Sequence, residues 1–175
     1  MPGNILNVSS FLNQQADIEL YNEIGKEFFR RFSNVKVTRI LTIEASGIGI
    51  ACITAQYFKA PVVFARKFRA KNLGSNLFST SVTSFTHGVD YTISVPKPFL
   101  HKSDSVLIID DFLANGCALE GLIKLIDISG AAFAGAGVVI EKGFQDGGRR
   151  IREQNLRIES LAIIDCMDEN KIVFR

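Results

Sequence analysis

The chain has 175 residues, of which 47% are hydrophobic and 22% charged, so its composition is typical of one globular domain and excludes a disordered or disulfide-dense protein. Lys and Arg number 20 against 18 Asp and Glu, and the formal charge of +2 provides no broad basic surface for nucleic acid. With only two histidines and three cysteines, a His-rich or Cys-rich metal site is excluded as well.

The first half of the chain alternates helix-like and strand-like segments. Apolar side chains three and four positions apart predict a helix over residues 16–32, and acids near its start with arginines near its end suit the helix dipole. Residues 67–80 are basic and then polar, and we expect a loop there because no periodicity holds through them. The expected elements are a helix at 16–32, a strand at 37–44, a turn at 45–47, a helix at 48–58, a strand at 61–66 and the loop at 67–80.

The second half continues this alternation and indicates the fold class. The expected elements are strands at 81–86 and 91–95 forming a hairpin, a strand at 105–110, a helix at 117–128 stopped by Gly130, a strand at 134–141, a helix at 146–154, and strands at 157–164 and 171–174. Strands that are apolar on both faces and alternate with helices predict an α/β fold, with a mostly parallel sheet covered by helices on both faces. No linker or repeat divides the chain, so we expect a single domain over residues 1–175. A ligand of such a fold binds at the carboxyl ends of the strands.

The cysteines and the N-terminus indicate a cytoplasmic protein. Cys52, Cys117 and Cys166 are odd in number, far apart and never in a C-x-x-C pair, so we expect free thiols, two of them buried, in a reducing compartment. The first residues lack the basic start and apolar run of a signal peptide. The longest apolar stretch, residues 131–140, has about half the length needed to cross a bilayer, so we expect no membrane partner.

Residues 106–118 carry the clearest chemical pattern. They read VLIIDDFLANGCA: an apolar strand, the adjacent acids Asp110 and Asp111 at its carboxyl end, a short loop with Asn115 and Gly116, and the start of a helix. Adjacent carboxylates repel each other and lose hydration there, so they persist cheaply only where positive groups or hydroxyls meet them. Backbone N–H groups at a helix N-terminus suit a phosphate. The segment favours a sugar phosphate, and a plain strand exit with solvated acids fits the same residues.

This segment resembles the phosphoribosyl-pyrophosphate (PRPP) motif of the type I phosphoribosyltransferases. Other stretches are similar to the xanthine phosphoribosyltransferase family and keep their order over roughly residues 5–174: LNVSSFLNQQAD, ILTIEASGI, PVVFARK, SVTSFT and GVVIEKGFQ. The two-acid motif alone indicates only the superfamily, whereas DDFLANG together with FLN and IEKGFQ is much more specific. The resemblance implies the type I phosphoribosyltransferase fold, a small hood formed by the N-terminal and C-terminal segments, and a homodimer.

The resemblance assigns PRPP to two acids and two loops. Asp110 and Asp111 match the acids that bind the ribose 2′- and 3′-hydroxyls, and they would meet, mostly indirectly, the Mg²⁺ that PRPP carries. The loop for the 5′-phosphate is matched by Ala114, Asn115, Gly116, Cys117 and Ala118, with Cys117 in place of the family's usual Gln. The loop for the diphosphate is matched by Glu44, Ala45, Ser46 and Gly47, and the cations that could meet its charge are Arg66 and Lys67. Lys71 and Gly74 lie in the stretch that resembles the loop closing over PRPP.

The resemblance also assigns residues to the purine base. Lys142 matches a lysine that contacts an exocyclic oxygen, which favours oxopurines over adenine because the 6-amino group of adenine is a donor. Phe144 could stack on the ring, and simple core packing is its alternative. Leu6 and Asn13 match base-contacting positions of the hood, where an Asn can both give and accept hydrogen bonds.

The reaction implied is transfer of the phosphoribosyl group from PRPP to xanthine, giving xanthosine 5′-monophosphate (XMP) and pyrophosphate in purine salvage. Two alternatives stay open. A hypoxanthine/guanine phosphoribosyltransferase would share the PRPP motif, because one lysine cannot separate the oxopurines. A non-catalytic PRPP-sensing purine regulator would need a DNA-binding domain, and we expect no room for one before the fold.

Overall fold

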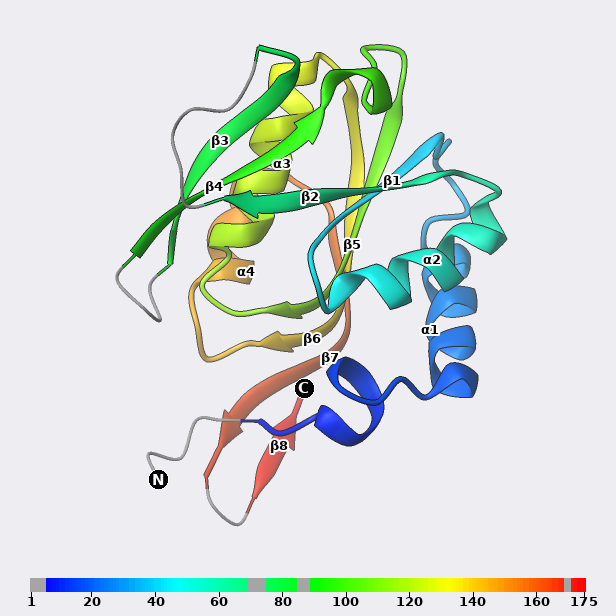
Figure 1. Ribbon diagram of the computed structural model, residues 1–175. Helices are drawn as coiled ribbons and strands as arrows, with labels where there is room; N and C mark the ends of the chain where they lie inside the picture. The colour runs from blue at the N-terminus through cyan, green and yellow to red at the C-terminus, as the bar shows by residue number, and fades with distance from the viewer. Residues whose placement is uncertain (1–5, 69–74, 85–88, 169–170) are drawn as a thin grey trace.

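One mixed sheet forms the centre of the molecule in the computed structural model, which describes residues 6–68, 75–84, 89–168 and 171–175. Within these residues the sheet has eight strands in the order β3-β4-β2-β1-β5-β6-β7-β8 (Figure 1). The strands are β1 (Arg39–Ile43), β2 (Val62–Phe68), β3 (Leu77–Ser84), β4 (Val89–Pro96), β5 (Ser105–Leu113), β6 (Ala132–Lys142), β7 (Ile158–Met167) and β8 (Ile172–Phe174). Strands β2, β1, β5, β6 and β7 run parallel to their neighbours within this group, so their carboxyl ends share one edge of the sheet.

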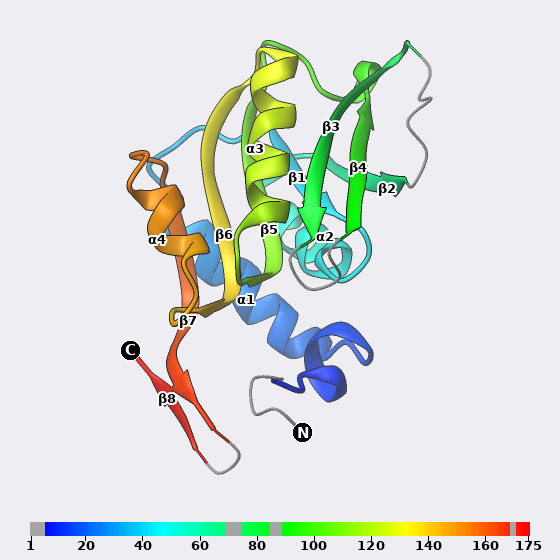
Figure 2. The same cartoon turned by 90° about the vertical axis from the view of Figure 1, so that its left-hand side faces the viewer.

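Helices cover both faces of this sheet, as the alternating pattern predicts. The helical elements are a π-helical turn η1 (Ser9–Asn13), α1 (Ile18–Arg31), α2 (Gly47–Phe58), a 3₁₀ turn η2 (Lys97–Phe99), α3 (Cys117–Ser129) and α4 (Gly147–Arg152). In Figure 2, α3 lies in front of the sheet and α1 and α2 lie behind it. Asp17 caps the start of α1, and its side chain accepts a hydrogen bond from the backbone N–H of Leu20 at 3.0 Å.

Two hydrophobic clusters lie on opposite faces of the sheet, and β5 contributes to both. Val106 and Ile108 belong to the cluster on the α3 side, whereas Leu107 and Ile109 belong to the cluster that α1 and α2 cover. All four side chains are fully buried, which explains the unbroken apolar run of this strand. Directly after Ile109 the apolar run gives way to Asp110, so the buried core leads directly to the candidate site.

The N-terminal turn and the β7–β8 hairpin lie at the end of the molecule where β5 and β6 finish (Figures 1 and 2). Val8 and Leu12 anchor this turn in the core, and the hydroxyl of Tyr21 donates to the carbonyl oxygen of Leu12. At the other end of the chain, Arg175 pairs with Asp165 at 2.7 Å. Both terminal segments are therefore tied to the domain beside the edge where the candidate site lies.

Three local expectations from the sequence are wrong. Strand β5 does not stop at Asp110 but continues through Leu113, which is buried. Strand β3 begins at residue 77 and β2 reaches residue 68, both inside the segment expected to be a loop. Two cysteines were expected to be buried, whereas Cys52 and Cys166 are exposed.

Candidate active site

Two buried carboxylates stand near the end of β5. Asp110 and Asp111 are 5% and 7% exposed, and the backbone N–H of Asp111 donates to Asp110 Oδ1 at 3.0 Å. Within the described ranges neither carboxylate forms a salt bridge. Burial raises the pKa of Asp110 well above its ordinary value, and the adjacent Asp111 carboxylate raises it further. An acid that is buried and forms no salt bridge is a candidate ligand-binding group.

The segment 44–47 after β1 is held by the neighbouring strand β2. The Glu44 carboxylate accepts the backbone N–H of Lys67 at 2.7 Å, and the Glu44 N–H donates to the carbonyl of Ala65 at 3.1 Å. The peptide bond between Glu44 and Ala45 is cis. The two hydrogen bonds to β2 hold the backbone of this loop directly before Ser46 and the first turn of α2.

Gly47 brings this loop against the acids of β5. A Cβ atom at this position would lie 3.0 Å from Asp110 Oδ1 and would collide with the hydroxyl of Thr42. That hydroxyl is buried and has no hydrogen-bond partner. Two motifs that are far apart in the sequence thus meet at one point, where only a residue without a side chain fits.

The segment after β5 forms a second loop at the start of α3. Gly116 has φ of +81°, a left-handed conformation that favours glycine. The N-terminus of α3 begins at Cys117, and unpaired backbone N–H groups at such an end favour an anion. A cavity of about 180 Å³ opens here; its lining consists of Thr83, Tyr91, Phe112, Leu113, Ala114, Asn115, Gly116, Cys117, Ala118 and Leu119. Burial, followed by the charge of Glu120, raises the pKa of the Cys117 thiol, so the thiol is neutral near pH 7.

The two cations of β2 lie on opposite faces of the strand, as the alternation of side chains requires. The Nζ atom of Lys67 is 5.7 Å from the centre of the Tyr91 ring, and its charge lowers the pKa of Asp110. The guanidinium of Arg66 instead lies 5.8 Å from the centre of the Phe64 ring, in a groove on the other side. The structure brings Lys67 to the acids and leaves Arg66 away from them.

The residues assigned to the base belong to elements at one end of the molecule (Figure 1). Lys142 ends β6 and is partly buried, and Phe144 is 36% exposed. Core packing is therefore the wrong alternative for Phe144. Asn13 ends η1 and is exposed, whereas Leu6 lines an apolar groove of about 620 Å³ between α1 and the strands β6 to β8. Lys142, Phe144 and Asn13 lie outside the lining of that groove.

Several residues near the acids were missed by the sequence analysis. One is Tyr21: burial, followed by the charge of Asp111, raises the pKa of its hydroxyl. Another is Tyr91, whose pKa is raised by burial, then by Cys117 and then by Asp110. Thr42 was missed as well, although the sequence carried a signal for it, since it is a polar residue inside the apolar run of β1. Lys71 and Gly74, assigned to the closing loop, lie outside the described residues.

Comparison with known proteins identifies the family of this fold and site. The sequence pattern described as the phosphoribosyl transferase domain matches residues 7–165. The chain belongs to the phosphoribosyl transferase family. A xanthine phosphoribosyltransferase of Lachnoclostridium phytofermentans is 61% identical over 175 residues, which cover 99% of this chain and 90% of that protein. The xanthine phosphoribosyltransferase of Alkaliphilus metalliredigens is 57% identical over 173 residues, covering 99% of this chain and 86% of that protein.

Solved structures of the same fold are similar as well. The adenine phosphoribosyltransferase of Thermoanaerobacter pseudethanolicus has a TM-score of 0.72 at 23% identity, covering 84% of this chain and 81% of that one. The enzyme of the same name from Leishmania donovani has a TM-score of 0.72 at 21% identity, covering 93% and 72%. At this identity the likeness establishes the fold alone. The predicted family and the predicted mostly parallel α/β fold are both confirmed.

Proposed function

We propose that this phosphoribosyltransferase transfers the phosphoribosyl group of PRPP to xanthine, giving XMP and pyrophosphate in purine salvage. One observation carries the proposal: the buried acids of β5 lie between two loops that suit anions, with Gly47 of one loop directly against Asp110. A sugar phosphate with a diphosphate at C1 has hydroxyls for the acids and an anion for each loop. Relatives at 57% and 61% identity that are named xanthine phosphoribosyltransferase support the choice of base.

The sugar would be bound through its hydroxyls and both phosphate groups. Asp110 and Asp111 would accept hydrogen bonds from the ribose 2′- and 3′-hydroxyls. These bonds would replace the hydrogen bonds to water that burial removes. The 5′-phosphate would meet the backbone N–H groups of Ala114, Asn115, Gly116, Cys117 and Ala118. The diphosphate would meet Glu44, Ala45, Ser46 and Gly47 through their backbone, with Lys67 nearer to it than Arg66.

Residues of β6, of the segment that follows it and of the hood would contact the base. Lys142 would donate to an exocyclic oxygen of xanthine, and the exposed ring of Phe144 would be available for stacking. Leu6 and Asn13 would close the site only if the hood moves toward Lys142 at the carboxyl end of β6, because the groove that Leu6 lines does not include Lys142. Base binding and hood position are therefore expected to be coupled.

Bond exchange at C1 would need positioning and charge stabilisation rather than a nucleophilic side chain. The bond from C1 to the diphosphate breaks through an oxocarbenium-like state, N9 of xanthine bonds to C1, and the N9 proton is released. Carboxylates suit Mg²⁺, and among the described residues no group of three or more His, Cys, Asp or Glu could hold a metal alone. Asp110 and Asp111 thus fit a Mg²⁺ that arrives on PRPP and retains substrate oxygens. When bound, the ion would offset charge on the departing diphosphate.

The whole chain would act as one domain in a homodimer in the cytoplasm. A groove of about 560 Å³ on the side of β2 that carries Arg66 contains the exposed rings of Phe64 and Phe99, which gives a second copy an apolar surface to cover. The three free cysteines suit a reducing compartment. Among the described residues, no helix has the length and apolarity needed to cross a membrane.

A competition assay among four purine bases tests the substrate. With Mg²⁺ and PRPP present, xanthine should be used in preference to guanine, hypoxanthine and adenine. Clear preference for hypoxanthine would refute the choice of base and support a hypoxanthine/guanine enzyme. Absence of pyrophosphate release with every base would refute transfer altogether.

A further inference from the structure

Helix α4 packs directly on the loop that follows β5. A Cβ atom at Gly147, the first residue of α4, would lie 2.5 Å from the backbone nitrogen of Gly116 and would overlap the carbonyl of Ala114. Conversely, a Cβ at Gly116 would lie 3.0 Å from the Cα of Gly147. Because no side chain separates the two backbones, any shift of α4 would move the loop with it.

Arg150 adds a polar link between α4 and the same loop. Its Nη2 donates to the carbonyl oxygen of Asn115 at 2.9 Å. The same guanidinium donates to Glu120 Oε1 from Nε at 3.0 Å and from Nη2 at 2.8 Å. Glu120 lies in the first turn of α3, so Arg150 joins the loop to the helix that follows it. A guanidinium on the Asn115 carbonyl also offsets the negative end of that dipole beside a proposed anion site.

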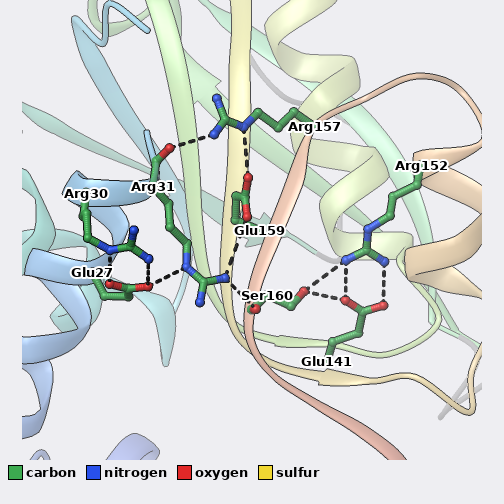
Figure 3. A network of polar contacts seen from close by, with 8 residues as sticks. All are labelled: Glu27, Arg30, Arg31, Glu141, Arg152, Arg157, Glu159 and Ser160. Atoms are coloured by element: carbon green, nitrogen blue, oxygen red, sulfur yellow. Dashed lines mark hydrogen bonds and ion pairs between the residues drawn. The ribbon is translucent and has the colours of Figure 1, made fainter. Parts of the chain in front are cut away.

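The other end of α4 is fixed to the strand that carries Lys142. Arg152 donates to both oxygens of Glu141, from Nη1 at 2.7 Å and from Nη2 at 2.6 Å. The hydroxyl of Ser160 on β7 donates to the same carboxylate (Figure 3). Arg31 of α1 then donates to the carbonyl of Ser160 at 3.0 Å, which extends the contacts to the opposite face of the sheet. The carboxylate of Glu141 is nearly inaccessible to water, so this end of α4 has little freedom.

We propose that α4 is a brace for the phosphate loop, and that Arg150 is the positioning residue that holds the Asn115 carbonyl away from the proposed 5′-phosphate. This inference rests on the proposed function, because it takes residues 114–118 as the phosphate-binding loop. Arg150 touches no substrate in this account. It acts by keeping the loop N–H groups in the one arrangement in which they converge on an anion.

The test compares Arg150→Met with Arg149→Met on the same helix. Arg149 is a matched control because it is exposed and, within the part of the chain that the structure describes, it pairs with Asp146 at 2.9 Å and Glu153 at 3.1 Å and not with the loop. Calorimetry with ribose 5-phosphate should show about tenfold weaker binding in Arg150→Met, the effect of losing one charged hydrogen bond. The Arg149→Met variant should bind like the wild type, and Arg150→Lys should be intermediate because it keeps the charge but not the fork.

Steady-state kinetics separate positioning from a general loss of structure. In Arg150→Met the KM for PRPP should rise about tenfold, while the KM for xanthine and inhibition by pyrophosphate stay within about twofold of the wild type. Equal ribose 5-phosphate affinity in Arg150→Met and Arg149→Met would overturn the brace, as would an equal rise in all three constants. If the wild type binds ribose 5-phosphate but releases no pyrophosphate with any purine, the proposed function fails and the brace stands.

Discussion

Two buried carboxylates on neighbouring strands have opposite surroundings. Asp110 on β5 and Glu141 on β6 are 5% and 3% exposed. Glu141 is saturated by Arg152 and Ser160, and although burial opposes this, these partners hold its pKa below the ordinary value. Asp110 has another acid, Asp111, as its immediate neighbour, and burial and that neighbour raise its pKa.

The difference separates a group that maintains the fold from a group that awaits a ligand. A buried ion pair has no net charge, and removing one partner lowers the free energy of unfolding because the other charge is left buried and unpaired. A buried acid that forms no salt bridge lowers stability locally and persists where function requires it. Each carboxylate should therefore respond to substitution in the opposite way, in activity and in stability.

The largest expected effect is on catalysis by the β5 pair. Replacing both acids, Asp110→Asn with Asp111→Asn, should lower kcat/KM by about 10²- to 10⁴-fold, because two charged hydrogen-bond acceptors for the ribose are lost. Unfolding in urea should show equal or higher stability, since two buried like charges are removed. A folded double variant with near-normal kcat/KM would show that these acids do not bind the sugar.

The opposite response is expected when Glu141 loses its partner. Arg152→Met should lower the free energy of unfolding by about 2 kcal/mol, less than for a fully buried pair because the Arg152 side chain is 35% exposed. Urea unfolding at pH 7 measures this loss. Specific activity per folded molecule should fall far less than in the double Asn variant. A stability unchanged from the wild type would remove the contrast between the two carboxylates.

Each carboxylate also has a glycine packed against it, which allows a matched pair of variants. A Cβ at Gly47 would lie 3.0 Å from Asp110 Oδ1, and a Cβ at Gly148 would lie 2.7 Å from Glu141 Cδ. Gly148→Ala should cost about 1–3 kcal/mol of stability by overpacking. Gly47→Ala should raise the KM for PRPP and weaken inhibition by pyrophosphate, because it displaces the loop at residues 44–47. If the two variants changed stability, the KM for PRPP and inhibition by pyrophosphate in the same way, the assignment of that loop to the diphosphate would be contradicted.

The smallest expected effect is on the pH dependence of stability, to which the two carboxylates should contribute with opposite sign. Asp110 binds its proton more tightly in the folded state, so its contribution to stability is full below its ordinary pKa of 3.8 and is lost as pH rises through the raised value. Glu141 contributes stability above its ordinary pKa of 4.5 and loses it as pH falls through the lowered value. Urea unfolding of Asp110→Asn should therefore show that the variant loses less stability than the wild type as pH rises. Glu141→Gln should show a weaker loss on the acid side; the same slope change in both would refute the comparison.

The sheet and its helices could be predicted from the sequence because strands and helices leave a local pattern of apolar and polar residues. The apolar run before Asp110 was long enough to indicate a strand buried on both faces, and Gly130 ended α3 as predicted. Strand β3 was predicted to begin at residue 81, four residues too late, because the basic and then polar stretch before it shows no periodicity; α3, from a distant part of the chain, packs against this strand.

The candidate site was predictable where a motif lies on one segment and not where contacts join distant ones. The acids and both loops follow from two short stretches of sequence. The separation of Arg66 from Lys67 depends on which face of β2 each occupies. The link from Arg150 to Asn115 crosses 35 positions and leaves no spacing signal. Tertiary contacts of this kind become visible only once the strands are placed.

Product analysis tests the central claim most directly. The enzyme would be incubated with PRPP, Mg²⁺ and xanthine, and XMP and pyrophosphate would be measured in the same sample. The account predicts that the two products form in equal amounts and only when xanthine is present. Pyrophosphate without XMP, or neither product from a folded protein, would contradict it.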